Sequence, residues 1–227
     1  MQARRSEVFM GTVFVLIAAI AFSSKGVMVK LAYRYPVDTE TLVMLRMTFA
    51  LPVFLAIALW VHFSGKSAHL TPRDALNIVL LGITGYYLPI WLDFAGLQYI
   101  SAGVERVIMF LYPTMVILIS ALLYGSRIGQ RETFALAASY VGVGMAAGAE
   151  TLATGAAAPH ALLGATLVFF SALTYAGYLV ASGRLIPRMG TTVFTAYIML
   201  VASLASIVHY VLIRTAHRSP ACHHKCM

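Results

Sequence analysis

Long apolar segments are the feature that most constrains this chain of 227 residues. A helix that crosses the hydrocarbon core of a bilayer needs about 20 mostly apolar residues. Seven segments that fit this requirement follow one another along the chain: residues 8–31, 41–63, 75–97, 102–124, 134–148, 162–185 and 193–213. They are apolar on nearly all sides, which favours helices over the alternating strands of a membrane barrel. The sequence therefore predicts an all-α polytopic membrane helical bundle.

Composition excludes an ordinary soluble domain. Hydrophobic residues make up 60% of the chain and charged residues only 11%, whereas soluble domains carry roughly 25% charged residues. Arg4 and Arg5 precede the first segment as they would in a signal peptide, but that segment is too long and no cleavage site clearly follows it. We therefore expect an uncleaved first helix.

The basic residues predict the orientation. The formal net charge is +8, and the basic residues concentrate at the N-terminus and in alternate loops, at Arg4, Arg5, Lys66, Arg73, Arg127, Arg131, Arg184 and Arg188. The opposite loops hold Arg34 beside the acidic Asp38 and Glu40, and Glu150. Loops rich in lysine and arginine face the cytoplasm, which places the N-terminus inside a cytoplasmic (inner) membrane and gives no reason to expect a nucleic-acid partner. Seven spans would put residues 214–227 outside, yet this tail carries Arg214, Arg218 and Lys225, against that rule.

When the loop charges, including Arg184 at the end of the sixth segment, are set aside, six charged residues remain within the predicted spans: Lys25, Lys30, Arg46, Asp93, Glu105 and Arg106. All belong to the outer half of the bundle, and charges at membrane depth must face one another, face water or extend to the interface. The excess of two cations favours a solute with a carboxylate or phosphate. The alternative is that Lys30 reaches the interface, that Arg46 or Arg106 pairs with Asp93 or Glu105, and that the set only holds helices together.

Prolines and aromatic residues surround these charges. Pro52, Pro89 and Pro113 interrupt apolar segments and predict kinks beside a pathway. Tyr86, Tyr87, Trp91 and Tyr112 are suited to line a cavity, although ordinary packing explains each one alone. On the fifth predicted helix, Gly142, Gly144 and Gly148 permit close backbone approach. Packing within one chain and a homodimer are both open for that helix.

A weak internal repeat is visible. A shift of 153 residues aligns Gly11, Val15 and Ala19 with Gly164, Val168 and Ala172, and places Tyr178 opposite Lys25. A unit of five helices has an odd number of spans, so a second copy would enter the membrane inverted. The predicted domains are a first five-helix repeat at 8–148, a partial second repeat of two helices at 161–213, and an aberrant tail at 214–227.

The sequence resembles the EamA-type drug/metabolite transporters. The resemblance rests on KGVMVKLAYRY from Lys25, TLVMLRMTFALPVF from Thr41, GYYLPIWLDFAGLQYISAGVERVIMFLYPT from Gly85, and the glycine-rich fifth helix. It implies a ten-helix carrier of small metabolites, built from two inverted five-helix repeats around a central cavity. Members commonly have a glutamate after the fourth helix where this chain has Ser126 between Gly125 and Arg127. The resemblance ends near residue 213, so the tail is expected to be out-of-frame or truncated sequence.

Other functions find less support in the sequence. Cys222, His223, His224 and Cys226 have the chemistry of metal ligands but irregular spacing, so neither a metal nor another cofactor is expected. SGKS at residues 64–67 lacks the glycine of a phosphate-binding loop. No nucleophile with a base is evident at membrane depth, and His209 is expected to be a packed or interfacial side chain. The alternative to a transporter is a truncated, non-transporting membrane protein or assembly partner.

The prediction for function is a secondary transporter of small metabolites, not an enzyme, whose partners are the lipid bilayer and a small, anionic or amphipathic solute. Proton coupling through Asp93 or Glu105 is left open. The candidate substrate-binding or translocation residues are Lys25, Arg46, Tyr86, Tyr87, Asp93, Glu105, Arg106, Tyr112, Pro113, Tyr175 and Tyr178.

Overall fold

The computed structural model describes residues 2–64, 71–125 and 160–218, together with residues 129, 130, 133, 134, 136–138, 140, 141 and 145. Regular structure in this part of the chain is helical, as predicted. The elements are α1 (Gln2–Ala32), α2 (Thr39–Phe63), α3 (Pro72–Leu80), the π-helix η1 (Leu81–Tyr87), α4 (Leu88–Gly96), α5 (Ala102–Met109), α6 (Tyr112–Tyr124), α8 (Ala161–Met189) and α9 (Thr191–Arg218).

Six helical segments of the described part are long and apolar enough to cross a membrane. They are Met10–Ala32, Thr39–Phe63, Pro72–Gly96, Ala102–Tyr124, Ala161–Met189 and Thr191–Thr215. Each matches a predicted span to within a few residues at either end. Only separate residues of the predicted fifth span, 134–148, are described, namely 134, 136–138, 140, 141 and 145, and Gly142, Gly144 and Gly148 lie outside the described residues. Large apolar side chains cover the outside of the bundle, with Leu122 and Phe63 more than 80% exposed, which is the surface that lipid requires.

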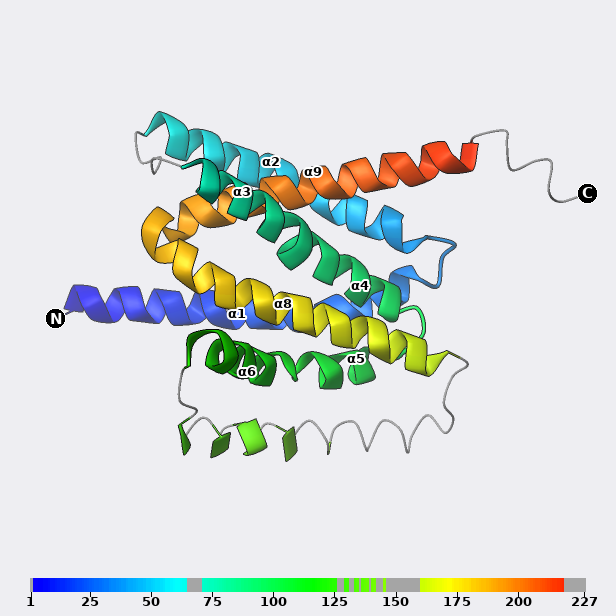
Figure 1. Cartoon of the computed structure of the whole chain (residues 1–227), viewed down its shortest axis with the longest axis horizontal. Coiled ribbons are helices and arrows are strands. Elements are labelled where there is room, and N and C mark those ends of the chain that lie inside the picture. The colour runs from blue at the N-terminus through cyan, green and yellow to red at the C-terminus, as the bar shows by residue number, and fades with distance from the viewer. Residues whose placement is uncertain are drawn as a thin grey trace, which may run out of the picture.

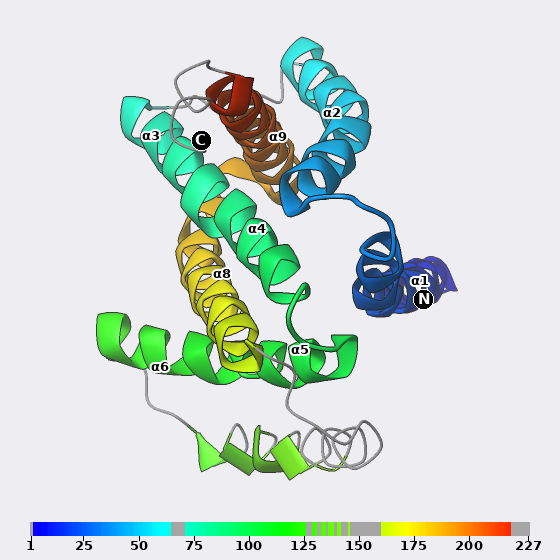
Figure 2. The same ribbon diagram turned by 90° about the vertical axis from the view of Figure 1, so that its right-hand side faces the viewer.

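The spans lie roughly parallel to one common axis and run in both directions along it. In Figure 1, α1, α3–α4 and α9 cross the picture one way, while α2, α5–α6 and α8 cross it the other way. Helices α2 and α9 pack side by side, and Arg214 near the end of α9 lies 3.3 Å from Asp38 just before α2. Helix α8 packs against α4, η1, α5 and α6, whereas α1 lies at the edge of the bundle next to α5 (Figure 2).

Proline explains where the third and fourth spans depart from a regular helix. Pro89 stands in the first turn of α4, directly after the π-helix η1, and Pro113 stands in the first turn of α6, directly after the break at residues 110–111. Proline has no backbone N–H to donate to the preceding turn, so the helix changes its hydrogen-bond pattern there. Pro52, in contrast, lies inside a continuous α2.

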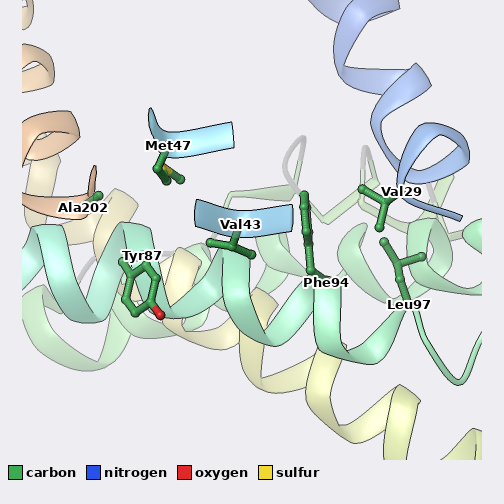
Figure 3. Packing of buried hydrophobic residues seen from close by; sticks show 7 residues of the cluster. All are labelled: Val29, Val43, Met47, Tyr87, Phe94, Leu97 and Ala202. Carbon is green, nitrogen blue, oxygen red and sulfur yellow. The ribbon is translucent and has the colours of Figure 1, made fainter. Parts of the chain in front are cut away.

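The buried core beside the α2–α9 pair joins helices that are distant in sequence. Its members come from five elements and meet at one place (Figure 3): Val29, Val43, Met47, Tyr87, Phe94, Leu97 and Ala202. Phe94 and Leu97 lie one helical turn apart, so both project from the same side of the third span toward α1 and α2. This cluster fixes the position of the residues immediately before Phe94.

Two glycines set the closest approach between α4 and α8. A Cβ atom on Gly164 would lie 2.8 Å from Tyr99 Cβ and 2.9 Å from the Gly96 carbonyl oxygen. A Cβ atom on Gly96 would lie 2.8 Å from the Gly164 carbonyl oxygen. Both distances are shorter than van der Waals contact, so the two backbones meet only because neither residue has a side chain.

We expect Gly164→Ala to destabilise the protein by about 1–3 kcal/mol because the added methyl group forces α4 and α8 apart. Gly183→Ala is the matched control, since it lies on the same helix and a Cβ atom there meets no atom within 4 Å. Thermal unfolding in detergent micelles checks both variants. Equal midpoints for the two would contradict the assigned contact.

Candidate functional site

A lysine and two carboxylates meet where three spans converge. Lys25 Nζ, from α1, lies 2.5 Å from Asp93 Oδ2 of α4 and 3.3 Å from Glu105 Oε1 of α5. Arg106 Nε lies 3.4 Å from the other carboxylate oxygen of Glu105. We call Lys25, Asp93, Glu105 and Arg106 the ionic cluster. It contains two cations and two anions, so their formal charges cancel when all four are ionised.

Local structure places each member of the ionic cluster. Ser101 caps α5 by accepting a hydrogen bond from the Val104 N–H at 3.2 Å, and the helix begins three residues before Glu105. Gly26 permits the close approach of α1, because a Cβ atom there would lie 3.2 Å from Glu105 Oε2. The docking of α1 and the position of the Glu105 carboxylate are therefore linked.

The carboxylates are deeply buried. Asp93 is 2% exposed and Glu105 is 0% exposed. Asp93 Oδ1 and Glu105 Oε2 are buried without a hydrogen-bond partner among the described residues. Buried polar atoms are nearly always hydrogen-bonded, so two unpartnered oxygens in one cluster require an explanation.

Arg46 lies near the ionic cluster but forms no salt bridge with any described residue. Its guanidinium carbon lies 5.6 Å from the centroid of the Phe94 ring, and Lys25 Nζ lies 6.0 Å from the same centroid. Both distances are within cation–π range. Phe94 is thus the aromatic residue that the two cations share.

Tyr33 holds the backbone of Phe94. Its hydroxyl donates to the Phe94 carbonyl oxygen at 2.8 Å and lies 2.9 Å from the Thr39 hydroxyl. Tyr33 lies between the first two spans, and burial raises the pKa of its phenol above the ordinary value. It therefore remains a neutral donor at physiological pH.

A cavity of about 90 Å³ opens beside the ionic cluster. A space of this size between polar groups accommodates several water molecules. Its lining comes from α1, α2, η1, α4, α5 and α8: Lys25, Arg46, Tyr86, Pro89, Ile90, Asp93, Met109, Ser171 and Tyr175. Ser171 also donates to the Pro89 carbonyl oxygen at 2.7 Å, which ties the wall on α8 to the proline of α4.

Tyrosines extend from the cavity in a connected series. The Tyr175 ring lies 5.7 Å from Tyr112 and 5.9 Å from Tyr178, and Tyr178 lies 6.0 Å from Tyr86. These are ordinary distances for interacting aromatic pairs. The series therefore joins η1, α6 and α8 around one side of the cavity.

Five of the predicted site residues line this cavity: Lys25, Arg46, Tyr86, Asp93 and Tyr175. Glu105 and Arg106 belong to the ionic cluster behind it, and Tyr112 and Tyr178 belong to the tyrosine series. Tyr87 and Pro113 belong to neither group. The Tyr87 hydroxyl forms a hydrogen bond with His209 Nδ1 on the side facing α9, where the Trp91 ring also contacts His209. Pro113 shapes the start of α6. Conversely, sequence reasoning missed Phe94, Ser171 and Met109. Nothing distinguishes them from other residues of apolar spans, although Phe94 directly follows Asp93.

Metal-binding residues do not gather in the described part of the chain. No group of three or more histidine, cysteine, aspartate or glutamate side chains there is placed to hold a metal ion. Cys222, His223, His224 and Cys226, which have the chemistry of metal ligands but irregular spacing, lie outside the described residues.

Lys25→Met should destabilise the protein by roughly 3–5 kcal/mol, because it leaves two buried carboxylates without their shared cation. Lys30→Met is the matched control, since Lys30 lies on the same helix and forms no salt bridge with a described residue. Denaturation in detergent measures both. Combining Lys25→Met with Asp93→Asn and Glu105→Gln should restore part of the loss, and equal stability of the two single variants would contradict the assigned ion pairs.

Comparison with known proteins agrees with this architecture. Residues 9–148 match the EamA-like transporter family. The chain is also 29% identical over 211 residues to a protein of Bacillus subtilis (strain 168) named uncharacterized transporter YcbK. The alignment covers 92% of this chain and 65% of that relative, so the chain spans less than two thirds of the relative's length. No solved structure matches. The family match covers more than half of the sequence together with Lys25, Arg46, Asp93 and Glu105, and the chain therefore belongs to the EamA-like transporter family.

Proposed function

We propose that this protein is a secondary transporter that moves a small amphipathic organic anion across the cytoplasmic membrane. The observation that carries the proposal is the position of Arg46. It shares a cavity with Lys25 and Asp93 and has no acidic partner among the described residues. An unneutralised cation at membrane depth is costly unless water or a ligand solvates it. A carboxylate, sulfonate or phosphate on the solute supplies that partner.

Charge balance supports an anion with a single charge. The formal charges of the ionic cluster cancel, so among the described residues that line the cavity the guanidinium of Arg46 is the remaining formal charge. A guanidinium binds carboxylates and related anions in a planar, two-point geometry. A monovalent anion would therefore bring the cavity to neutrality, while a cation would meet repulsion.

The tyrosine series supports an amphipathic body on that anion. Tyr86 and Tyr175 line the cavity together with Ile90 and Met109, and Tyr112 and Tyr178 continue the aromatic surface. Aromatic and thioether side chains offer an apolar surface with few polar atoms. Binding sites for small molecules commonly combine such a lining with a few polar groups that fix orientation.

Alternating access accounts for the small size of the cavity. A volume of about 90 Å³ holds several water molecules, and we expect helices to separate when a metabolite binds. The antiparallel packing of α2 against α9 is the relation expected for the second helices of two inverted repeats. We place the N-terminus in the cytoplasm on the basis of the loop arginines, including Arg184 and Arg188.

Counterflow in liposomes tests the proposal. Purified protein would be reconstituted and loaded with unlabelled benzenesulfonate, a permanent anion with an aromatic body, and entry of labelled benzenesulfonate would be followed. We expect exchange well above that of protein-free liposomes, while glucose and choline compete poorly. Absence of exchange for benzenesulfonate and for methanesulfonate, phenylacetate and succinate would overturn the proposal.

Arg46→Gln should raise the half-saturating concentration of benzenesulfonate by about 10- to 100-fold, since a hydrogen bond to a charged group contributes roughly 1.5–3 kcal/mol. Arg34→Gln is the matched control. It removes a cation from the loop between α1 and α2, at the same end of the bundle, without touching the cavity lining. Counterflow at graded concentrations measures both variants. Similar half-saturation for the two would show that Arg46 does not bind the anion.

A further inference from the structure

The ionic cluster contains two acceptor atoms that no described donor satisfies. Asp93 Oδ1 and Glu105 Oε2 are both buried, and both belong to carboxylates that already share the ammonium of Lys25. Arg106 Nε approaches Glu105 Oε2 to 3.4 Å as an ion pair, without the geometry of a hydrogen bond. Each of the two oxygens therefore has a lone pair available for a small ligand.

We propose that the ionic cluster binds one exchangeable proton, shared by Asp93 and Glu105, and that the proton crosses the membrane together with the anion. The inference rests on the proposed function and names its coupling ion. The proton adds to a carboxylate oxygen from water on one side and returns to water on the other side, and no electron is transferred. Protonation turns one carboxylate into a hydroxyl donor, which removes one of the unsatisfied acceptors.

A proton fits this site better than a metal cation does. Hard metal ions require several oxygen ligands arranged around them. Here two carboxylates are available, and the Lys25 ammonium lies within 3.3 Å of both. The described residues offer no third acidic ligand in the same place. A proton needs a single lone pair and tolerates the neighbouring ammonium.

The cavity gives the proton a route to water. Asp93 lines the cavity, whereas Glu105 is fully buried behind it. Lys25 contacts both carboxylates and lines the cavity as well. A proton therefore enters at Asp93 and is retained by the pair, as intramembrane carboxylates do in other proton pathways.

Electrostatics links the proton to the anion. The charged groups that face the pair are Lys25 from α1 and Arg106 from α5, and Arg46 from α2 lies across the Phe94 ring. Adding one proton changes the cluster from neutral to a charge of +1. A unit charge about 10 Å from a bound anion, at an effective dielectric constant of about 20, alters anion affinity by roughly tenfold. Linkage requires that the anion raise proton affinity by the same factor.

Ion gradients across reconstituted liposomes test the inference. An inward proton gradient, acidic outside, should drive benzenesulfonate above its equilibrium concentration, while a sodium gradient at equal pH should not. A pH-sensitive dye inside should report about one proton per benzenesulfonate. Because one proton and one monovalent anion carry no net charge together, uptake should be insensitive to a potassium diffusion potential.

The same liposomes separate failure of this inference from failure of the proposed function. Counterflow without proton-driven accumulation, or uptake that follows the membrane potential or a sodium gradient, would overturn proton coupling and leave the transporter proposal standing. Absence of counterflow for every probe anion would overturn both. These measurements use the unsubstituted chain and so do not depend on the folding of any variant.

Glu105→Gln should reduce the number of protons taken up per benzenesulfonate from about one to near zero, measured on the benzenesulfonate uptake that the variant retains. It should also abolish the roughly tenfold change of half-saturating concentration between alkaline and acidic medium. Glu40→Gln, at the start of α2 and outside the cavity lining, is the matched control and should keep both properties. A ratio near one in Glu105→Gln would contradict the shared proton.

Discussion

The ion pairs of Lys25 are the interaction on which the rest of the architecture depends. Helix α1 lies at the edge of the bundle, and much of its surface is exposed apolar side chain. In a bilayer, such a surface gains little by leaving lipid for another helix, so polar contacts and close packing must hold the helix in place. Lys25 supplies the polar contacts and Gly26 supplies the close approach, both directed at Glu105. The same contact that docks α1 also neutralises the carboxylates at the cavity.

Hydropathy predicted the spans well because the physical requirement is severe. Each helix must cover the same hydrocarbon thickness, so length and apolar content locate it within a few residues. The sequence also predicts the helix breaks beside Pro89 and Pro113, since proline removes a backbone donor wherever it stands. Hydropathy does not say which faces touch, because lipid and protein accept the same side chains. The contact of Gly96 with Gly164 therefore had no signature in the apolar pattern.

The sequence indicated which residues to consider for the candidate site but not how they pair with one another. Placing a charged side chain in the hydrocarbon region costs free energy, and this alone identified Lys25, Arg46, Asp93 and Glu105 as candidates. Which of the cations pairs with the acids was left open, and the structure pairs them with Lys25 and Arg106 while Arg46 faces Phe94. Tyr86 and Tyr87 show the limit of such reasoning. They are neighbours on the π-helix η1 and project in different directions, so Tyr86 reaches the cavity and Tyr87 reaches His209.

The π-helix η1 contributes residues to the cavity and to a second hollow. A space of about 420 Å³ lies between α3, α6 and α8, and its lining includes Leu81, Arg184 and Arg188, with the Arg184 guanidinium 3.6 Å from the centre of the Tyr124 ring. Leu81 is the first residue of η1, and Tyr86 near its other end lines the cavity. A π-helix holds a less favourable hydrogen-bond pattern than the α-helix, and such segments recur at functional sites. The least regular part of the third span thus contributes residues to both hollows, with Pro89 directly after it. A change in the hydrogen-bond pattern of η1 would therefore alter both hollows at once, which is the kind of coupled movement that the proposed transport would require.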